Sequence, residues 1–308
     1  MKRLMLLLAL CLSLPAFAQY TRSAGTNAPA ADIVIETRAD PKTGTVRQER
    51  IERPVQRDSH GNAASAQHDL AVDGAFDGQT VVVIQLYTGS DHGVPFDFVK
   101  PKEALAQKGF SVYRYLNRPP APKELAEKLQ KASQLWVIGG AGRQLTEEHA
   151  RVIKRFFDSG RGVYLWGDNA PYSDDANIVA RALFGTELVE HHAQGEQVVG
   201  IHRKGSEPGV IQRHLLTTGI EYLYEGHTIT NIDKLGPLEP LIYGSDGRVV
   251  GAYYDRDGKR AIIDGGFTRL YLKWDTAGTG RYVMNAAAWL ANAERFGDKV
   301  VARKVQQQ

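Results

Sequence analysis

From residue 80 onward, short apolar runs alternate with longer amphipathic stretches, the pattern expected of β-strands alternating with α-helices. Each run is bounded by Gly, Pro or small polar residues, which favour chain turns. The predicted strands of this part are 80–87, 110–115, 134–138 and 162–167. Repeated strand–helix units predict a parallel sheet covered by helices on both faces.

The stretches between these strands carry recognisable helix signals. Pro101 and Pro122 each stand near the start of an amphipathic stretch, where a missing backbone N–H costs nothing. Thr146 and Ser173 are expected to cap the next two helices, and acidic residues follow both, where the helix dipole favours them. A closing helix is predicted over about 281–295.

After residue 185 the pattern becomes more β-like. Strands are predicted at 197–202, 248–254 and 260–264, the last two joined by the hairpin-type turn D-R-D-G. The sequence therefore predicts a flavodoxin-like, three-layer α/β sandwich with a mostly parallel sheet and an added β segment. We expect this domain to span 79–296, with a tail at 297–308.

Residues 1–18 have the pattern of a secretory signal peptide. Lys2 and Arg3 precede a short apolar run, and A-F-A at 16–18 fits a cleavage site near Ala18. The run is too short for a membrane span, so none is expected after cleavage. The predicted location is periplasmic or secreted.

Residues 19–78 are expected to form a flexible arm and linker. Alternation at 32–38, a D-P-K-T-G turn and the charged stretch 45–55 predict a β-hairpin of the edge-ribbon type. Residues 59–77 are expected to be linker, so removing 19–75 is predicted to leave the melting temperature nearly unchanged.

Charge and cysteine content exclude several function classes. The chain has 38 basic and 35 acidic residues; losing Lys2 and Arg3 leaves 36 against 35, a net charge of +1. Such balance argues against nucleic-acid binding, which needs a concentrated basic face. Cys11 is the only cysteine, so the cleaved chain has no disulfide, thiolate metal site or cysteine nucleophile.

Polar side chains follow the predicted strands at the edge where α/β folds bind ligands. Carboxylates, an imidazole and hydroxyls that converge there suit a cation, a sugar or a polar metabolite. Because Asp also forms turns, a purely structural role for Asp168 stays open. The candidate ligand-binding residues are Asp91, His92, Arg143, Asp168, Asn169, Asp264 and Thr268. No catalytic residue is assigned.

Metal and nucleotide sites find little support. Asp174 and Asp175 do not have EF-hand spacing and are better explained by the helix start. The histidines match no zinc motif, so no metal ligand is assigned, although a divalent cation stays possible as a cofactor. The GGAGR loop at 139–143 could hold an anion but lacks a nucleotide-binding spacing.

Four segments together resemble the class I glutamine-amidotransferase-like superfamily, and within it the ThuA-like (trehalose-utilisation) branch. The resemblance spans roughly residues 80–295 and none of the N-terminal arm. The segments are IKRFFDSGRGVYLWGDN, ALFGTELVEHH, RHLLTTGIEYLYEGHTI and GKRAIIDGGFTRLYLKWDTAGTGRYVMNAAAWLAN. The first is similar to the branch's F-x-x-x-G-G-G-x-V-G-x-H segment, and the third to H-P-I-T-x-G followed by an aromatic and acidic stretch.

The resemblance implies an amidotransferase-like fold without amidotransferase chemistry. The family nucleophile would fall near Gly167 and Asp168, where no cysteine stands, and the branch's histidine is replaced by Asp168 or Asn169. Our first hypothesis is a non-catalytic binding or scaffold module that uses the Asp168 crevice for a small polar ligand or another envelope protein.

The alternative hypothesis is a hydrolase or lyase acting on carbohydrate-like substrates. Asp91, Asp168 and Asp264 would then serve as acid–base or cation-holding groups, and His92 would carry the proton. This alternative expects the three carboxylates to converge.

Overall fold

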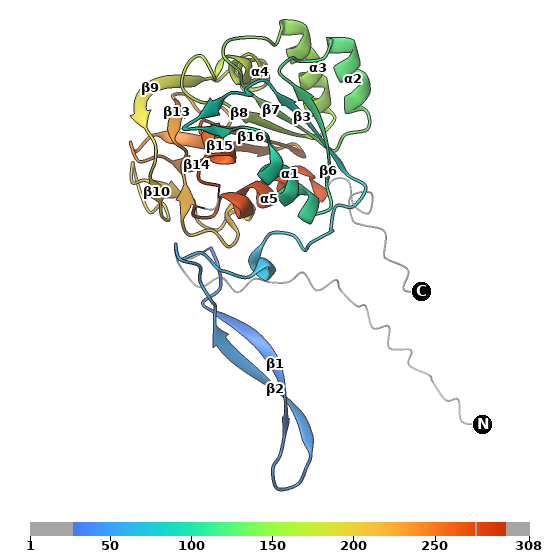
Figure 1. Ribbon diagram of the computed structural model, residues 1–308, viewed down its shortest axis with the longest axis vertical. Helices are drawn as coiled ribbons and strands as arrows, with labels where there is room; N and C mark the ends of the chain where they lie inside the picture. Colours follow the sequence, from blue (N-terminus) through green and yellow to red (C-terminus); the bar gives the residue numbers. More distant parts are fainter. Residues whose placement is uncertain (1–26, 275, 294–308) are drawn as a thin grey trace, which may run out of the picture.

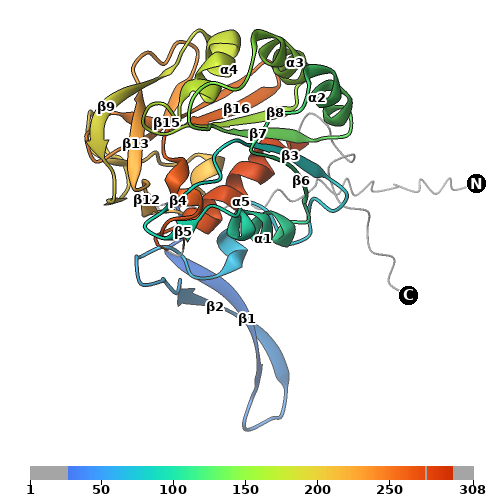
Figure 2. The same cartoon turned by 45° about the horizontal axis from the view of Figure 1, so that its top comes forward.

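The computed structural model describes residues 27–274 and 276–293, without the side chains of Asp91 and residues 190–194. An eight-stranded sheet lies between two layers of helices, as Figures 1 and 2 show. α2, α3 and α4 cover one face, and α1 and α5 cover the other. The helices are α1 (Val99–Gln107), α2 (Pro122–Leu129), α3 (Glu147–Asp158), α4 (Asp174–Phe184) and α5 (Thr279–Leu290). This arrangement confirms the predicted layered α/β class.

The central sheet combines a parallel and an antiparallel half. Its strands run in the order β11-β14-β15-β16-β8-β7-β3-β6, parallel from β16 to β6 and antiparallel from β11 to β16. Their bounds are β3 (Thr80–Gln85), β6 (Ser111–Leu116), β7 (Gln134–Ile138), β8 (Gly162–Trp166), β11 (Gly209–Val210), β14 (Glu239–Tyr243), β15 (Val249–Arg256) and β16 (Lys259–Asp264). The antiparallel half is the added β segment.

Strand alternation divides the interior into two hydrophobic cores. Along β3, Val81 and Val83 join the core that contains the α5 residue Val283, while Val82 and Ile84 join the core that contains Ile153 of α3. Successive strand side chains point to opposite faces, so one fully apolar strand supplies both cores.

Four further strand pairs and three short 3₁₀ turns complete the described chain. The pairs are β1 (Ala31–Ala39) with β2 (Val46–Pro54), β4 (Ser90–Asp91) with β5 (Val94–Pro95), β9 (Leu188–Gln194) with β13 (Thr228–Ile232), and β10 (Val198–Val199) with β12 (Leu223–Tyr224). The turns are η1 (Ala66–His68), η2 (Leu215–Thr217) and η3 (Phe267–Leu270).

Several of the predicted elements differ in the structure. The strand expected at 197–202 contracts to β10, because the chain leaves the pairing after Val199. Ser173 precedes α4 with helical backbone angles, so its side chain makes no cap hydrogen bond. The closing helix ends at Leu290, earlier than predicted.

Residues 55–78 pack against the body, which differs from the expected flexible linker. Asp69 is buried and pairs with Lys108 Nζ at 2.8 Å and with Arg281 Nε at 2.6 Å. Phe76 stacks on Phe110, with ring centroids 4.6 Å apart. The polar composition of this segment concealed the contacts, because its acidic residues are satisfied by partners far along the chain.

The signal segment predicted at 1–18 and the tail predicted at 297–308 lie outside the described residues. Within the described ranges, none of the helices combines the length and hydrophobicity that a bilayer crossing requires.

Candidate functional site

The strand order places a topological switch between β3 and β7, one strand away from β8. After β3 the chain forms the edge strand β6 and then returns to the opposite side of β3 as β7, which neighbours β8. Connections diverge at such a point, and the space at the carboxyl ends of the strands is where open α/β sheets bind ligands. Asp168 stands two residues beyond β8, at this edge.

Asp168 is a buried carboxylate that is satisfied on one side only. Its Oδ1 accepts hydrogen bonds from the Asn169 amide at 2.8 Å and from the Thr228 hydroxyl. Its Oδ2 has no hydrogen-bond partner in the described part of the chain. Burial disfavours the charged form more than these donors, together with the nearby amide and hydroxyl of Thr268, favour it, and raises the pKa of Asp168 to about 7. Near neutral pH, the group can therefore either hold or release a proton.

Thr268 fixes the backbone that brings Thr228 to Asp168. Its hydroxyl accepts a hydrogen bond from the His227 amide at 2.9 Å and lies 3.3 Å from the Thr228 carbonyl oxygen, to which it donates. η3 therefore positions the start of β13 over the end of β8. Thr268 and Asn169, both predicted site residues, thus lie around Asp168.

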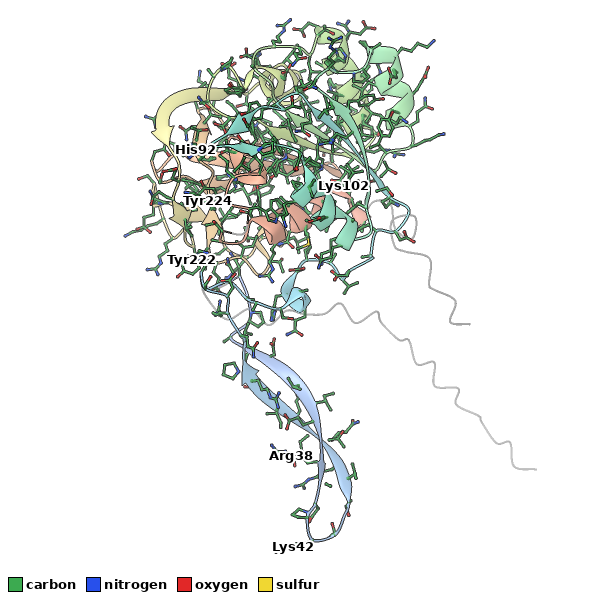
Figure 3. All side chains as sticks on the ribbon, viewed as in Figure 1. Arg38, Lys42, His92, Lys102, Tyr222 and Tyr224 are labelled. Carbon is green, nitrogen blue, oxygen red and sulfur yellow. The ribbon has the colours of Figure 1, made fainter. Side chains whose placement is uncertain are left out.

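Two histidines and a glutamate lie on the outer side of this group. His227 Nδ1 is 2.6 Å from Glu196 Oε1, and its Nε2 is 3.1 Å from Nε2 of His92. The two rings meet edge to face, with centroids 4.6 Å apart. His92 is exposed, in the turn between β4 and β5, and Figure 3 labels it on the same side of the body as Tyr224. An imidazole oriented by a carboxylate is a competent proton carrier.

Buried polar groups lie behind the histidines. The Tyr224 hydroxyl has no hydrogen-bond partner among the residues described. Burial raises its pKa to about 12, and the negative charges of Glu196, Glu225 and Asp168 add to the rise. Arg269 donates from Nη2 to the Glu225 carbonyl oxygen at 2.7 Å, while its Nη1 has no partner in the described ranges. Unpartnered buried polar atoms are rare and suit a site for water or a polar ligand.

Asp264 belongs to the internal support of the site. Its carboxylate accepts from the Tyr282 hydroxyl at 2.9 Å and the Gly266 amide at 3.0 Å, and pairs with Arg269 Nη2 at 3.0 Å. Burial raises the pKa of Asp264, and the Arg269 charge opposes the rise. In the described part of the chain none of these hydrogen-bond donors also donates to Asp168, so the convergence expected for the two carboxylates stays a prediction.

Arg143, another predicted residue, makes none of these contacts in the described chain. Arg143 is exposed, in the GGAGR loop. The Asp175 carboxylate accepts three backbone hydrogen bonds from this loop and the two residues after it. The donors are the amides of Gly140, Gln144 and Leu145, at 3.3, 2.7 and 2.7 Å. The loop thus holds an anion, but the anion is the protein's own side chain. The Asp91 side chain lies outside those described.

Sequence reasoning missed the contributions of Glu196, Tyr224, His227 and Thr228. The available signal was the E-G-H-T run at 225–228, where Gly226 adopts φ +121°. That conformation suits glycine and lets the chain bend sharply into β13. Among the described residues, no cluster of three or more His, Cys, Asp or Glu is arranged to hold a metal ion.

Comparisons with known proteins show the fold. No protein-family model matches the chain, and no curated protein matches it. Among solved structures, the N-terminal domain of mmIFT52 is similar at 13% identity, with a TM-score of 0.52, over 68% of this chain and 97% of that one. The two chains share a fold, and identity this low extends the likeness no further.

Two further solved structures are more distant. A ThuA-like protein from Parabacteroides merdae is 13% identical, with a TM-score of 0.44, over 74% of this chain and 93% of that one. The exo-β-1,4-mannosidase Op5Man5 from an Opitutaceae bacterium is 12% identical, with a TM-score of 0.40, over 70% of this chain and 36% of that one. Scores in this range carry no argument about function.

Proposed function

We propose that this protein is a periplasmic or secreted binding module with an amidotransferase-like fold. It takes a small, polar, carbohydrate-like ligand at the strand ends around Asp168. In this proposal the chain is a divergent relative of the ThuA-like branch, and the chain has no nucleophilic cysteine at the site. Another envelope protein that presents such a group is the second kind of partner we propose.

The half-satisfied carboxylate of Asp168 carries this proposal. An oxygen left unpartnered inside a protein costs free energy, so its retention at a strand end suits a polar ligand atom. The unpartnered Tyr224 hydroxyl and Arg269 Nη1 offer further polar atoms close to this position. Sugars present hydroxyl groups that both donate and accept, which fits a carboxyl group, a phenol and a guanidinium in one site.

One contact favours the enzymatic alternative, a hydrolase or lyase acting on carbohydrate-like substrates. The His227 imidazole is oriented by Glu196 and contacts His92, an arrangement suited to proton transfer. Asp264 takes no part in this version, because its carboxylate is engaged with Arg269 and Tyr282.

A thermal-shift experiment tests the proposal. The full chain is melted with trehalose, cellobiose, glucuronate, and calcium or magnesium chloride. The same series is run on Asp168→Ala and His227→Ala. His202→Ala is the matched control, since that histidine stacks on Tyr243 away from the site. We expect a sugar-dependent rise in melting temperature in the wild type and the control that both site variants lose.

The same ligands distinguish binding from catalysis. Product analysis of cellobiose and trehalose after incubation should show intact sugars. Turnover that disappears in His227→Ala and persists in His202→Ala would replace the binding proposal with the enzymatic alternative. Equal melting shifts in Asp168→Ala and the wild type would place the ligand elsewhere and contradict both versions.

A further inference from the structure

The projecting hairpin of β1 and β2 has two unlike faces. On one face every arginine is paired: Arg38 lies 3.5 Å from Glu36 and 3.5 Å from Glu49, Arg47 lies 3.0 Å from Glu49, and Arg53 pairs with Glu36. These charges cover the half-buried Val34 and Ile51, which face each other across the strands. This face is complete without a partner.

The opposite face leaves several apolar side chains uncovered. Its side chains include Ile33, Ile35 and Val46, whose exposed fractions are 46%, 66% and 62%. Glu52 lies across from Ile33, and Arg50 lies across from Ile35. Neither charge forms an ion pair within the described chain. The face therefore presents an isoleucine stripe beside one free acid and one free base.

The root of the hairpin is held firmly. The Asn27 side chain donates to the Ile220 carbonyl oxygen at 2.8 Å and accepts from the Arg213 amide at 2.9 Å. The Asn62 side chain accepts from the Glu221 and Tyr222 amides at 2.7 and 2.8 Å. From this root the ribbon extends away from the body, as Figures 1 and 2 show and as the labelled Arg38 and Lys42 mark in Figure 3.

Such an arm needs a partner to be stable. A two-stranded ribbon alone is marginal in water, and exposed isoleucines gain free energy when they are covered. The order of charges on the apolar face indicates which partner fits. Going from root to tip, the acid Glu52 comes first and the base Arg50 two residues later along the same strand face.

We propose that the arms of two copies of this chain pair face to face through the Ile33–Ile35 stripe. The two-fold axis runs across the strands, between the two facing ribbons and level with Val34. It therefore reverses the order of the side chains in the partner. Ile33 then covers the partner's Ile35, and Glu52 meets the partner's Arg50. Both free charges become paired at once, so the face is complementary to itself, as an isologous dimer interface requires.

Sedimentation equilibrium of the full chain tests this pairing. The wild type is expected to form a concentration-dependent dimer, and Ile33→Ser/Ile35→Ser is expected to sediment as a monomer. Val72→Ser is the matched control, because Val72 is 76% exposed but lies outside the β1–β2 hairpin. The control should dimerise like the wild type.

Charge reversal tests the register independently of hydrophobicity. Arg50→Glu and Glu52→Arg each place like charges together and should weaken the dimer about tenfold. The double variant Arg50→Glu/Glu52→Arg restores both pairs and should recover wild-type association. A wild-type chain that remains monomeric would overturn the proposal and point to a different protein as the arm's partner. Failure of the double variant to recover would also overturn it, as would a dimer that survives loss of the isoleucines.

Discussion

The Thr228 hydroxyl donates a hydrogen bond to Oδ1 of Asp168, while Oδ2 of the same carboxylate has no partner among the residues described. The contact joins the start of β13 to the end of β8, strands of two different sheets. A carboxylate satisfied on one oxygen and buried on the other is poised between its charged and neutral forms. When neutral, it can donate a hydrogen bond through Oδ2; when charged, it can accept one there.

Asp168→Asn should change how the free energy of unfolding depends on pH. Burial raises the pKa of Asp168 to about 7 in the folded state, from 3.8. The folded state therefore binds the proton more tightly than the unfolded state. As pH rises from about 4 to about 7, the contribution of Asp168 to the free energy of unfolding falls by up to about 4 kcal/mol, and above that pH it stays constant. Asparagine cannot ionise, so the variant should gain stability relative to the wild type as the pH rises.

Urea unfolding at about pH 4.5 and about pH 8 measures this difference. Asp174→Asn is the matched control for removing a carboxylate from the same segment, because Asp174 is half-buried and lies six residues further along. If the unfolding free energies of Asp168→Asn and the wild type differ by the same amount at both pH values, Asp168 is ionised in the folded state over this whole pH range.

The ion pairs of Asp69 should dominate the anchoring of residues 55–78. Asp69→Ala removes the buried one of the two carboxylates that pair with the Lys108 ammonium, and it removes the contact to Arg281. Removing one partner of a buried ion pair costs about 3 to 5 kcal/mol, and because Asp73 still pairs with Lys108 we expect a loss at the lower end of this range in urea unfolding. Asp73 is the other partner of Lys108, and the Asp73 side chain is 54% exposed. Asp73→Ala should therefore cost about 1 kcal/mol or less. Equal losses in the two variants would contradict this ranking.

Asp175→Ala should release the GGAGR loop. Its carboxylate accepts three backbone amides from residues 140–145, and their loss should cost about 2 to 4 kcal/mol. Because Arg143 is exposed within this loop, trypsin should also cleave there faster. Asp174→Ala, in the same first turn of α4, should change neither stability nor cleavage by a comparable amount. Wild-type cleavage rates in Asp175→Ala would show that the loop holds itself.

Much of the fold follows from local pattern. The strand predicted at 134–138 has the same bounds in the structure. Thr146 caps α3 as predicted, and its hydroxyl accepts a hydrogen bond from the His149 amide. Both depend on short-range signals, namely an apolar run and a capping residue before an amphipathic stretch. The antiparallel strands β11 and β14 were not predicted, because their pairing is set by residues far apart in sequence.

The site was only partly predictable for the same reason. Asp168 follows a buried strand, so its position at a strand end could be inferred from sequence. Thr228 lies 60 residues further on, and its hydrogen bond to Asp168 depends on how β13 is held by η3. Asp264 appeared equivalent to Asp168 by its place after a strand, yet its carboxylate is taken up by Arg269 and two tyrosines. Position at the end of a strand does not determine which partners a side chain finds in the folded chain.

Excision of the arm should leave the body intact, whereas a longer deletion should not. The Val55 amide donates to the Ala30 carbonyl oxygen at 3.2 Å, so two glycines can replace residues 31–54 without strain at the root. We expect this variant to melt within about 2 °C of the wild type. Deleting 19–75 removes Asp69 and its ion pairs as well, and should lower the melting temperature by about 10 °C or more. This revises the expectation from sequence that the whole segment is dispensable. Differential scanning calorimetry of the two variants separates the arm from the packed segment, and equal melting temperatures would mean that residues 55–75 add nothing to the body.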